Sequence, residues 1–413
     1  MKILLRSIYN YAFSVLILFI PFEDYIRALP NILLGVLAIS FPFIVHQKDF
    51  NKLKNVGSYF FFGLFLFIVI TTLIFDRWDD NFHIIKKLLI AIVLVIFFLP
   101  VKDVIKINRA IIFSSLLAIG FSLFNIVVLV NNTGAFDFGD NQNPLNTLLI
   151  DRLYLGLLCL MSILVSCREI TNGTSAFKKF HILNCIVSIA FLFLIVSKIA
   201  IITLLLVALL RLLYKKIRLT ILLASIGFFA IILTAAVLAN GNLSTRFLYK
   251  TSNSSNVAFV EHIMQREPRA KIWECGYLIA KQESVLISGI GFKSTNEALL
   301  TCYNDHIENE GRKGWFLLQK YNTHNQFLDF FLSTGFISFI LFLGIFIAFF
   351  LRHRRHFFPT ALLLSLFLLV CVESLFHRQI GAFYFGIVMI YLIFYTNRAN
   401  QANITEIDEV QKY

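Results

Sequence analysis

The sequence predicts an all-α, polytopic integral membrane protein, on the evidence of its composition and its long apolar runs. Of the 413 residues, 58% are hydrophobic and only 15% are charged, and the mean hydropathy is +0.78. Soluble domains carry about 25% charged residues. The apolar runs approach the ~20 residues that a membrane-spanning helix needs, and they lack the period-two alternation of a transmembrane β-barrel.

The chain is basic, with a formal net charge of +13 from 37 Lys and Arg residues against 24 Asp and Glu residues. In a membrane protein such an excess is typical of cytoplasmic loops, which accumulate Lys and Arg. No DNA- or RNA-binding motif accompanies the charge. Nucleic acid is therefore not expected as a partner.

The apolar runs predict about twelve transmembrane helices. The boundary between the seventh and the eighth depends on Ser197 and Lys198, which are the only turn residues in that stretch. In chain order the twelve segments are 8–22, 28–46, 56–75, 83–100, 108–131, 147–167, 180–197, 198–213, 219–239, 325–351, 357–373 and 380–397.

The distribution of basic residues predicts the orientation of these helices. With the N-terminus in the cytoplasm, the cytoplasmic loops hold most of the Lys and Arg residues of the short loops. Both termini are therefore expected in the cytoplasm, and the first apolar run, which lacks a small-residue cleavage site, is expected to stay as a helix. The resulting regions are nine helices in 1–239, an external loop in 240–324, three helices in 325–397 and a cytoplasmic tail in 398–413.

The external loop 240–324 is too long to be a mere connector. Pro268 suits the first turn of a helix. In that helix one face would carry Arg269, Trp273, Gly276 and Ala280. Ser294 and Glu297 have the spacing of a capping box before a second helix. We expect two short helices lying on the outer surface of the membrane.

Six cysteines are present, and none has the spacing of a metal site. Those in the apolar segments are expected to act as small core residues; they are Cys159, Cys167, Cys185 and Cys371. Cys275 and Cys302 both fall in the external loop. Two unpaired thiols are expected there, with a disulfide as the alternative.

Ionisable residues at membrane depth are costly, which makes each of them a functional candidate. The outward-facing ends of the predicted helices collect Arg152, Lys198, Arg269, His324, Glu373 and Arg378. Clustered cations suit a polyanionic ligand such as a lipid phosphate or pyrophosphate, which arginine grips with two donors. The alternative is that they are interfacial anchors paired with headgroups or carboxylates.

His324 begins the tenth predicted helix, in "YNTHNQFLDFFLSTG". Histidine is well suited to take a proton from a sugar hydroxyl near neutral pH. Gly335 follows about three helical turns later and is expected on the same helix face, where it permits close approach of a helix or a lipid chain. The alternative for His324 is a capping or snorkelling role at a helix start.

These motifs resemble the bacterial O-antigen ligases and the related O-antigen polymerases. The resemblance rests on twelve helices with a large loop between the ninth and the tenth, and on three ordered motifs. The motifs are "RAKIWECGYLIAKQESVLISGIGF" (269–292), "HNQFLDFFLSTG" (324–335) and "VESLFHRQIGAFYFG" (372–386). Where the family often has Ser-Arg at the start of the eighth helix, this chain has Ser197-Lys198, which keeps the charge but loses the bidentate fork.

The resemblance implies an inverting glycosyltransferase of lipopolysaccharide biosynthesis in the bacterial inner membrane, acting at the periplasmic face. A glycan would move from undecaprenyl pyrophosphate to an acceptor hydroxyl. His324 would be the general base, and Arg269 would be catalytic and would hold the pyrophosphate together with Arg152, Lys198 and Arg378. Glu373, Asn325, Gly335 and Trp273 would support the site. With this many cations, no metal or other cofactor is required.

Several alternatives remain open on the sequence alone. The acceptor is either a lipid A core, which makes a ligase, or a second lipid-linked glycan, which makes a polymerase. A metal-dependent glycosyltransferase would use Glu23 and Asp24 in the first external loop. A lipid or solute transporter is disfavoured by the arrangement of nine helices followed by three, which is not that of two inverted halves.

Overall fold

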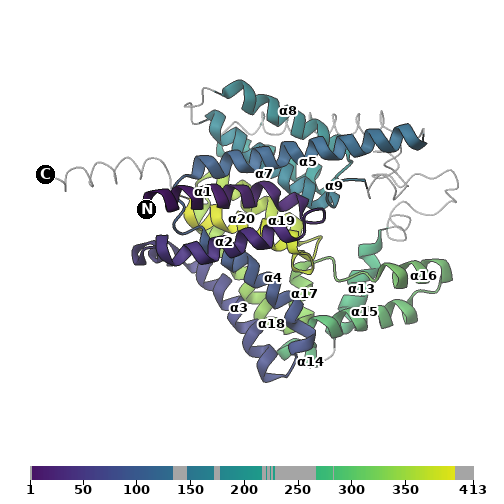
Figure 1. The fold of residues 1–413 in the computed structure, drawn as a ribbon. Helices are drawn as coiled ribbons and strands as arrows, with labels where there is room; N and C mark the ends of the chain where they lie inside the picture. The colour runs from purple at the N-terminus through teal and green to yellow at the C-terminus, as the bar shows by residue number, and fades with distance from the viewer. Residues whose placement is uncertain are drawn as a thin grey trace.

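The computed structural model describes residues 2–133, 147–171, 177–215, 267–281 and 283–395, together with the single positions 220, 224 and 227. Every regular element in these residues is a helix (Figure 1). The all-α prediction is therefore confirmed for the part of the chain that the structure describes.

The N-terminal helices follow one another with short connections. They are α1 (Lys2–Phe19), η1 (Ile20–Phe22), α2 (Ala28–Ile44), η2 (Gln47–Leu53), α3 (Val56–Ile74), α4 (Trp78–Phe97), α5 (Val104–Thr133), α7 (Arg152–Thr171), α8 (Lys178–Leu194) and α9 (Lys198–Tyr214). The break between α8 and α9 lies at Ser197, where the sequence predicts it.

The C-terminal part contains a group of short helices and then longer apolar ones. They are α13 (Pro268–Ala280), α14 (Glu283–Ser288), α15 (Phe292–His306), α16 (Glu310–Gln319), α17 (Gln326–Thr334), α18 (Phe336–His353), α19 (Phe357–Val370), η3 (Leu375–His377) and α20 (Gln379–Phe394).

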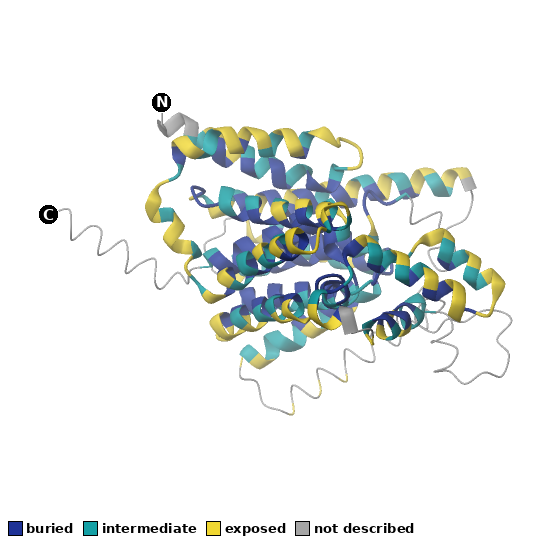
Figure 2. Cartoon of the chain, turned by 90° about the horizontal axis from the view of Figure 1, so that it is seen from below, coloured by how far each residue is buried: buried dark blue, intermediate teal, exposed yellow. Residues whose placement is uncertain are grey.

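Helix α20 lies at the centre of the bundle. Every residue from Ile380 to Ile393 is buried, since the helix is apolar around its whole circumference. It packs against α4, α19 and α7. Figure 2 shows buried residues gathered along the middle of the molecule and exposed ones on its outer helices.

The outer helices expose large apolar side chains, as a lipid-facing surface requires. Ile39 of α2 and Phe124 of α5 are 73% and 66% exposed. In the described residues, α3, α5, α7 and α18 are long and apolar enough to cross a membrane, and α2 with η2 makes a fifth if that bent pair is one span. Helices cover each predicted segment except 219–239, most of which lies outside the described residues. The twelve-span topology stays a prediction.

The predicted helix over 325–351 is wrong in one respect, because it is two helices. Gly335 separates α17 from α18 and has φ of 87°, in the left-handed region that favours glycine. A Cβ there would collide with the backbone oxygen of Ile287 in α14. The close approach expected at Gly335 therefore exists, but Gly335 is not three turns along one continuous helix from His324.

Helices α13 to α16 form a unit at one side of the bundle (Figure 1) with a hydrophobic core of its own. A disulfide joins Cys275 of α13 to Cys302 of α15, which corrects the expectation of two unpaired thiols. Helix α13 begins at Pro268 as predicted. The capping box at Ser294 is wrong: α15 begins two residues earlier, and Ser294 Oγ donates to Asp80 Oδ2 at 2.5 Å.

Hydrogen bonds to backbone carbonyl oxygens attach this unit to the bundle. The amides of Ile290 and Gly291 donate to the carbonyl oxygens of Leu332 and Ser333 at 2.9 and 2.8 Å. Arg77, before α4, donates to the carbonyl oxygens of Ser288 and Gly289. The connection between α14 and α15 is thus fixed to α17, which follows directly after His324.

Candidate active site

The beginnings of α7, α9 and α20 meet at one end of the bundle. Ser197 Oγ donates to the carbonyl oxygen of Arg152 at 3.4 Å, which brings α9 to α7. Arg378 directly precedes α20, and its NH1 lies 3.4 Å from Asp151 Oδ2 beside α7. The ends that carry Arg152, Lys198 and Arg378 therefore lie together.

His324 and Glu373 form a hydrogen-bonded pair at this end. His324 Nδ1 lies 3.1 Å from Glu373 Oε2, and the side chains are 22% and 9% exposed. His324 has φ of 43°, a conformation uncommon outside glycine, and its backbone amide donates to Asn322 Oδ1 at 3.0 Å. The local turn thus aims the imidazole at a carboxylate that is 49 residues away in sequence.

Glu373 is ionised in this environment. Burial opposes its charge, but the hydrogen bond and charge of His324, with the charges of Arg378 and Arg269, outweigh burial and hold the pKa of Glu373 below its ordinary value. A carboxylate can only accept, so His324 Nδ1 carries the proton and donates. Whenever the ring is neutral, the other ring nitrogen, Nε2, keeps its lone pair and can act as a base.

Arg269 lies directly beside this pair. It stands in the first turn of α13, where Pro268 opens the helix, and its Nε donates to the carbonyl oxygen of Val372 at 3.2 Å. Its NH1 lies 2.7 Å from Glu267 Oε1. Lys198 interacts electrostatically with both Glu267 and Arg269. Two predicted cations thus approach the histidine–carboxylate pair from the side of α9 and α13.

Arg378 approaches the pair from the other side. Its guanidinium lies 5.8 Å from the centre of the Tyr154 ring, and Tyr154 OH donates to Glu373 Oε1 at 3.4 Å. Arg152 has a buried NH1 with no hydrogen bond among the described residues. An uncompensated buried donor is costly, which is consistent with a site that takes an anion there.

The residues predicted to support the site hold the turn that carries His324. Asn325 caps α17, because its Oδ1 accepts from the amides of Phe327 and Leu328 at 2.9 and 3.1 Å. Trp273 Nε1 donates to the carbonyl oxygen of Thr323 at 3.2 Å. Gly335 lies at the far end of α17, against α14.

Asp329 is a polar centre of the site that the sequence reasoning missed. It is fully buried, and it accepts from Gln326 Nε2 at 3.0 Å and from His377 Nε2 at 3.0 Å. Thr323 Oγ1 lies 3.3 Å from its other oxygen and 2.8 Å from Ser374 Oγ. Asp329 therefore ties the turn of His324 to the loop of Glu373. The sequence does show Asp329 as a single carboxylate within an apolar segment, and such a residue is a candidate for a functional role.

A comparison with known protein families gives one match. Residues 183–343 match the family model described as O-Antigen ligase. This stretch of the chain is therefore similar to the O-antigen ligases. The matched stretch includes Arg269 and His324, whereas Glu373 and Arg378 lie beyond it. No curated protein matches the chain.

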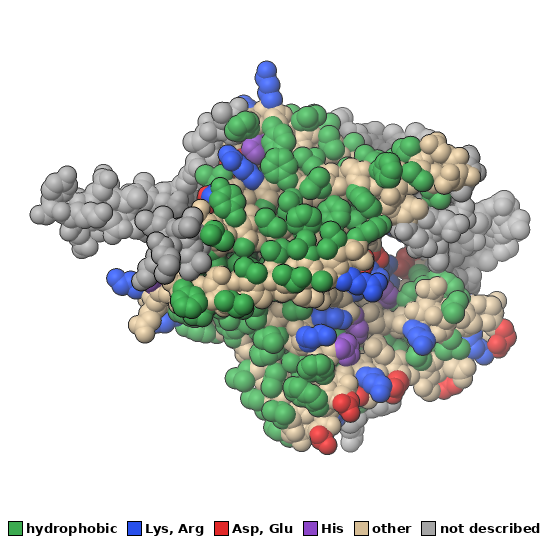
Figure 3. Space-filling view, in the orientation of Figure 1, with side chains coloured by type: hydrophobic (Ala, Val, Ile, Leu, Met, Phe, Trp, Pro, Cys, Tyr) green, Lys and Arg blue, Asp and Glu red, His purple; other side chains and the backbone are tan. Residues whose placement is uncertain are grey.

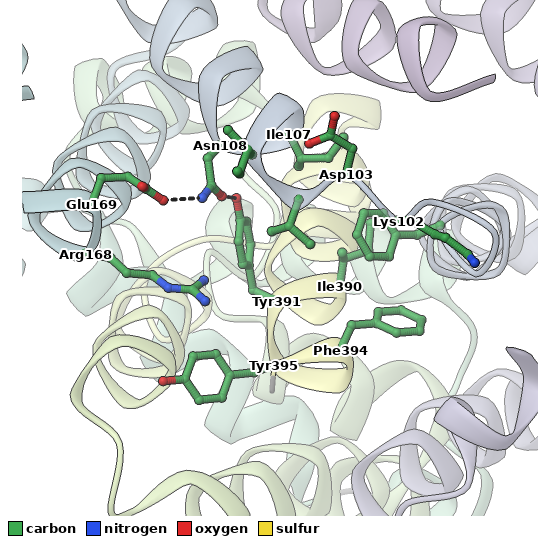
Figure 4. Close-up of a pocket in the computed structure, with 13 residues that line it drawn as sticks. Lys102, Asp103, Ile107, Asn108, Arg168, Glu169, Ile390, Tyr391, Phe394 and Tyr395 are labelled. Atoms are coloured by element: carbon green, nitrogen blue, oxygen red, sulfur yellow. Dashed lines mark hydrogen bonds between the residues drawn. The ribbon is translucent and has the colours of Figure 1, made fainter. Parts of the chain in front are cut away.

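The protein also has a cavity of about 250 Å³, at the opposite ends of the same helices (Figure 4). Tyr391 OH donates to Asn108 Oδ1 at 2.6 Å, and Asn108 Nδ2 donates to Glu169 Oε1 at 2.8 Å, which satisfies these groups internally. Arg168 lies over the rings of Phe358 and Tyr395. This cavity is separate from the His324 site, which lies where α7 and α20 begin.

Proposed function

We propose that the protein transfers a glycan from undecaprenyl pyrophosphate to a hydroxyl of a lipid A core, at the periplasmic face of the bacterial inner membrane. The observation that carries the proposal is the hydrogen bond from His324 to the buried carboxylate of Glu373, with Arg269 beside them. A base and a group of cations at one end of an apolar bundle suit a reaction between a hydroxyl and a lipid pyrophosphate.

His324 is the general base in this proposal. Its Nε2 takes the proton of the acceptor hydroxyl as the oxygen attacks the anomeric carbon. The imidazolium that forms is stabilised by the charge of Glu373 at Nδ1. Tyr154, which donates to the second oxygen of Glu373, keeps that carboxylate oriented toward the histidine.

The leaving group is the undecaprenyl pyrophosphate. The bond between the anomeric carbon and the phosphate oxygen breaks, and the electron pair stays on the pyrophosphate. Arg269 and Lys198 would stabilise this charge from one side, with Arg152 and Arg378 near the beginning of α7. Attack opposite the leaving group inverts the anomeric carbon. These cations supply the charge stabilisation that a metal ion would otherwise give.

A polymerase is the second candidate, since the same base and cations serve an acceptor that is itself a lipid-linked glycan. A metal-dependent enzyme built on Glu23 is disfavoured. Glu23 Oε1 accepts from the amide of Ile380 at 3.0 Å, and the positive charges of Lys87 and Arg378 act on its carboxyl. Two nearby cations oppose a divalent ion.

The test is the electrophoretic profile of lipopolysaccharide from cells lacking the gene, rescued with wild type, His324→Ala or Arg269→Ala. If the protein is a ligase, cells with either variant should make rough lipopolysaccharide and keep the polymer on the lipid carrier outside the cytoplasm. Both variants should be present in the membrane at the normal level. A core capped with a single repeat unit indicates the polymerase. His306→Ala, at an exposed histidine of α15, is the matched control. A normal lipopolysaccharide ladder in cells with either variant would contradict the proposal. Lipid-linked glycan that accumulates in the cytoplasm would indicate a transporter instead.

A further inference from the structure

A second group of basic side chains lies on the other side of the loop that carries Glu373. His83, Lys86 and Lys87 are spaced three and four residues apart, which places them on one face of α4. Figure 3 shows Lys, Arg and His side chains gathered on the face of the molecule where α2 and α4 lie. Lys86 is exposed, and His83 and Lys87 are half-buried.

The geometry of this group is fixed by the buried residues below it. Lys87 Nζ donates to the carbonyl oxygen of His377, and the rings of His83 and His377 lie 5.9 Å apart, edge to face. His377 Nε2 donates to the fully buried Asp329, which leaves Nδ1 for another partner. The group is therefore anchored to the same carboxylate that ties the turn of His324 to the loop of Glu373.

Glu23 adds an unsatisfied polar atom to the group. Its Oε1 accepts from the amide of Ile380, but its Oε2 is buried and has no hydrogen-bond partner among the described residues. A buried polar atom without a partner costs free energy, and a ligand beside it removes that cost. A protonated carboxyl there can donate to a phosphate oxygen.

The group is distinct from the cations at His324. Arg269 contacts the start of the loop through the carbonyl oxygen of Val372, whereas Lys87 contacts its end through that of His377. Arg378 follows and acts electrostatically on both Glu373 and Lys87. The loop of residues 371–378 thus has one cationic group at its beginning and another at its end.

Apolar helix surface adjoins the second group. Helix α2 contacts α4 and exposes Ile32 and Ile39, and α4 exposes Phe82 and Leu89. Cations above exposed apolar helices match a lipid whose phosphate sits at the membrane boundary and whose chain follows the helices. A soluble phosphate would make no use of that apolar surface.

We propose that His83, Lys86 and Lys87 bind the phosphate of the second lipid substrate, the acceptor, while Arg269 and Lys198 bind the pyrophosphate of the donor. This inference rests on the proposed function, which requires two lipid-borne substrates. It places the two headgroups on the two sides of one loop, with the His324–Glu373 pair and Arg378 between them.

The test is two-substrate kinetics with the purified full chain in lipid nanodiscs. The donor is an undecaprenyl-pyrophosphate-linked glycan, and the acceptor is lipid A core in one series and a second lipid-linked glycan in another. Lys86→Gln and His83→Gln are expected to raise the KM for the acceptor about tenfold and to leave the KM for the donor unchanged. Lys86→Arg is expected to restore the acceptor KM. Lys48→Gln, at an exposed lysine near the opposite ends of the helices, is the control.

A binding measurement separates this inference from the proposed function. Native mass spectrometry of the same chain with lipid A core, with undecaprenyl pyrophosphate and with phosphatidylglycerol needs no transfer. We expect lipid A core to lose binding in Lys86→Gln but not in Arg269→Ala, and undecaprenyl pyrophosphate to lose binding in Arg269→Ala but not in Lys86→Gln. An unchanged acceptor KM, or loss of phosphatidylglycerol binding alone, overturns the inference and indicates a phospholipid anchor only. Absence of transfer by the wild-type protein would count against the proposed function. The binding measurement would still show whether His83, Lys86 and Lys87 bind the acceptor lipid.

Discussion

At the scale of single residues, the pair of His324 and Glu373 decides which imidazole nitrogen is free. Glu373→Gln keeps an acceptor of the same shape but removes the charge that stabilises the imidazolium. We expect kcat for transfer to fall about a hundredfold, with little change in the KM of the donor. The measurement is steady-state transfer at matched protein level, with the exposed Glu308→Gln as control. Equal kcat in Glu373→Gln and wild type would show that the carboxylate has no catalytic part.

Glu23 makes the stability of the fold depend on pH. Burial raises its pKa to about 7, with Asp24 adding to the shift and Ile380, Lys87 and Arg378 opposing it. The folded state therefore holds a proton that the unfolded chain releases near pH 4.5. The resulting stabilisation is fully present below pH 4.5 and is lost as the pH rises through about 7.

Glu23→Gln removes this titration. We expect the Tm of wild type to fall between pH 5 and about pH 8, and the Tm of Glu23→Gln to fall less over the same range. Thermal unfolding in detergent at a series of pH values measures the difference. Parallel Tm profiles for the two proteins would contradict the assignment of a raised pKa to Glu23.

The sequence identified residues whose type is costly in a membrane, and the structure brings several of them together. His324, Glu373, Arg269 and Lys198 were predictable because charge is rare in an apolar chain. The partner of each was not predictable, since the contacts join segments far apart in sequence. Asp329 was missed because its apolar neighbours suggest a plain helix, while its hydrogen bonds come from the turn and the loop beside it.

At the scale of elements, Gly289 and Gly335 allow the unit of α13 to α16 to contact the bundle closely. Gly289 has φ of 64°, and a Cβ there would collide with the backbone of Ser333 and Thr334. Gly289→Ala should therefore destabilise the protein by about 2 kcal/mol or more and lower transfer, because the contact positions α17 after His324. Gly120→Ala is the control, since nothing lies within 4 Å of its Cβ. Thermal unfolding and transfer measure both, and an unchanged Tm in Gly289→Ala would contradict this account.

The disulfide between Cys275 and Cys302 also stabilises the unit of α13 to α16. It spans 27 residues, and closing such a loop stabilises a fold by about 3 kcal/mol. Cys275→Ser with Cys302→Ser should therefore speed proteolysis within α13 to α16 before the rest of the chain is cut. Cys371→Ser, at a free cysteine, is the control. Equal cleavage rates in the double variant and wild type would contradict the stabilising role.

Local signals predicted some elements well and others poorly. Pro268 marks the beginning of α13 because its ring fits a first helical turn. The break at Gly335 was not predicted, since the apolar run continues through it and only the contact with α14 requires a left-handed residue there. The spacing of Ser294 and Glu297 was misleading, because Asp80 of α4 takes the serine hydroxyl.

At the scale of the whole molecule, hydropathy predicted an all-α membrane protein, and the described residues confirm the helices. It could not predict which helices lie at the centre. Helices α7, α19 and α20 have apolar runs like those of the outer helices, yet they are the most completely buried. Their position follows from long-range packing around α20, and it brings the His324–Glu373 pair to one end of the bundle.

Transfer by the purified protein in the presence of a divalent-metal chelator shows directly whether His324 is the base of a metal-independent reaction. The assay contains undecaprenyl-pyrophosphate-linked glycan, an acceptor lipid, and wild type, His324→Ala or the control His306→Ala. We predict that wild type and His306→Ala transfer the glycan with the chelator present. His324→Ala should bind the donor normally but lose transfer by about a hundredfold or more. Transfer by His324→Ala at the wild-type rate, or loss of all transfer on chelation, would contradict a metal-independent reaction with His324 as its base.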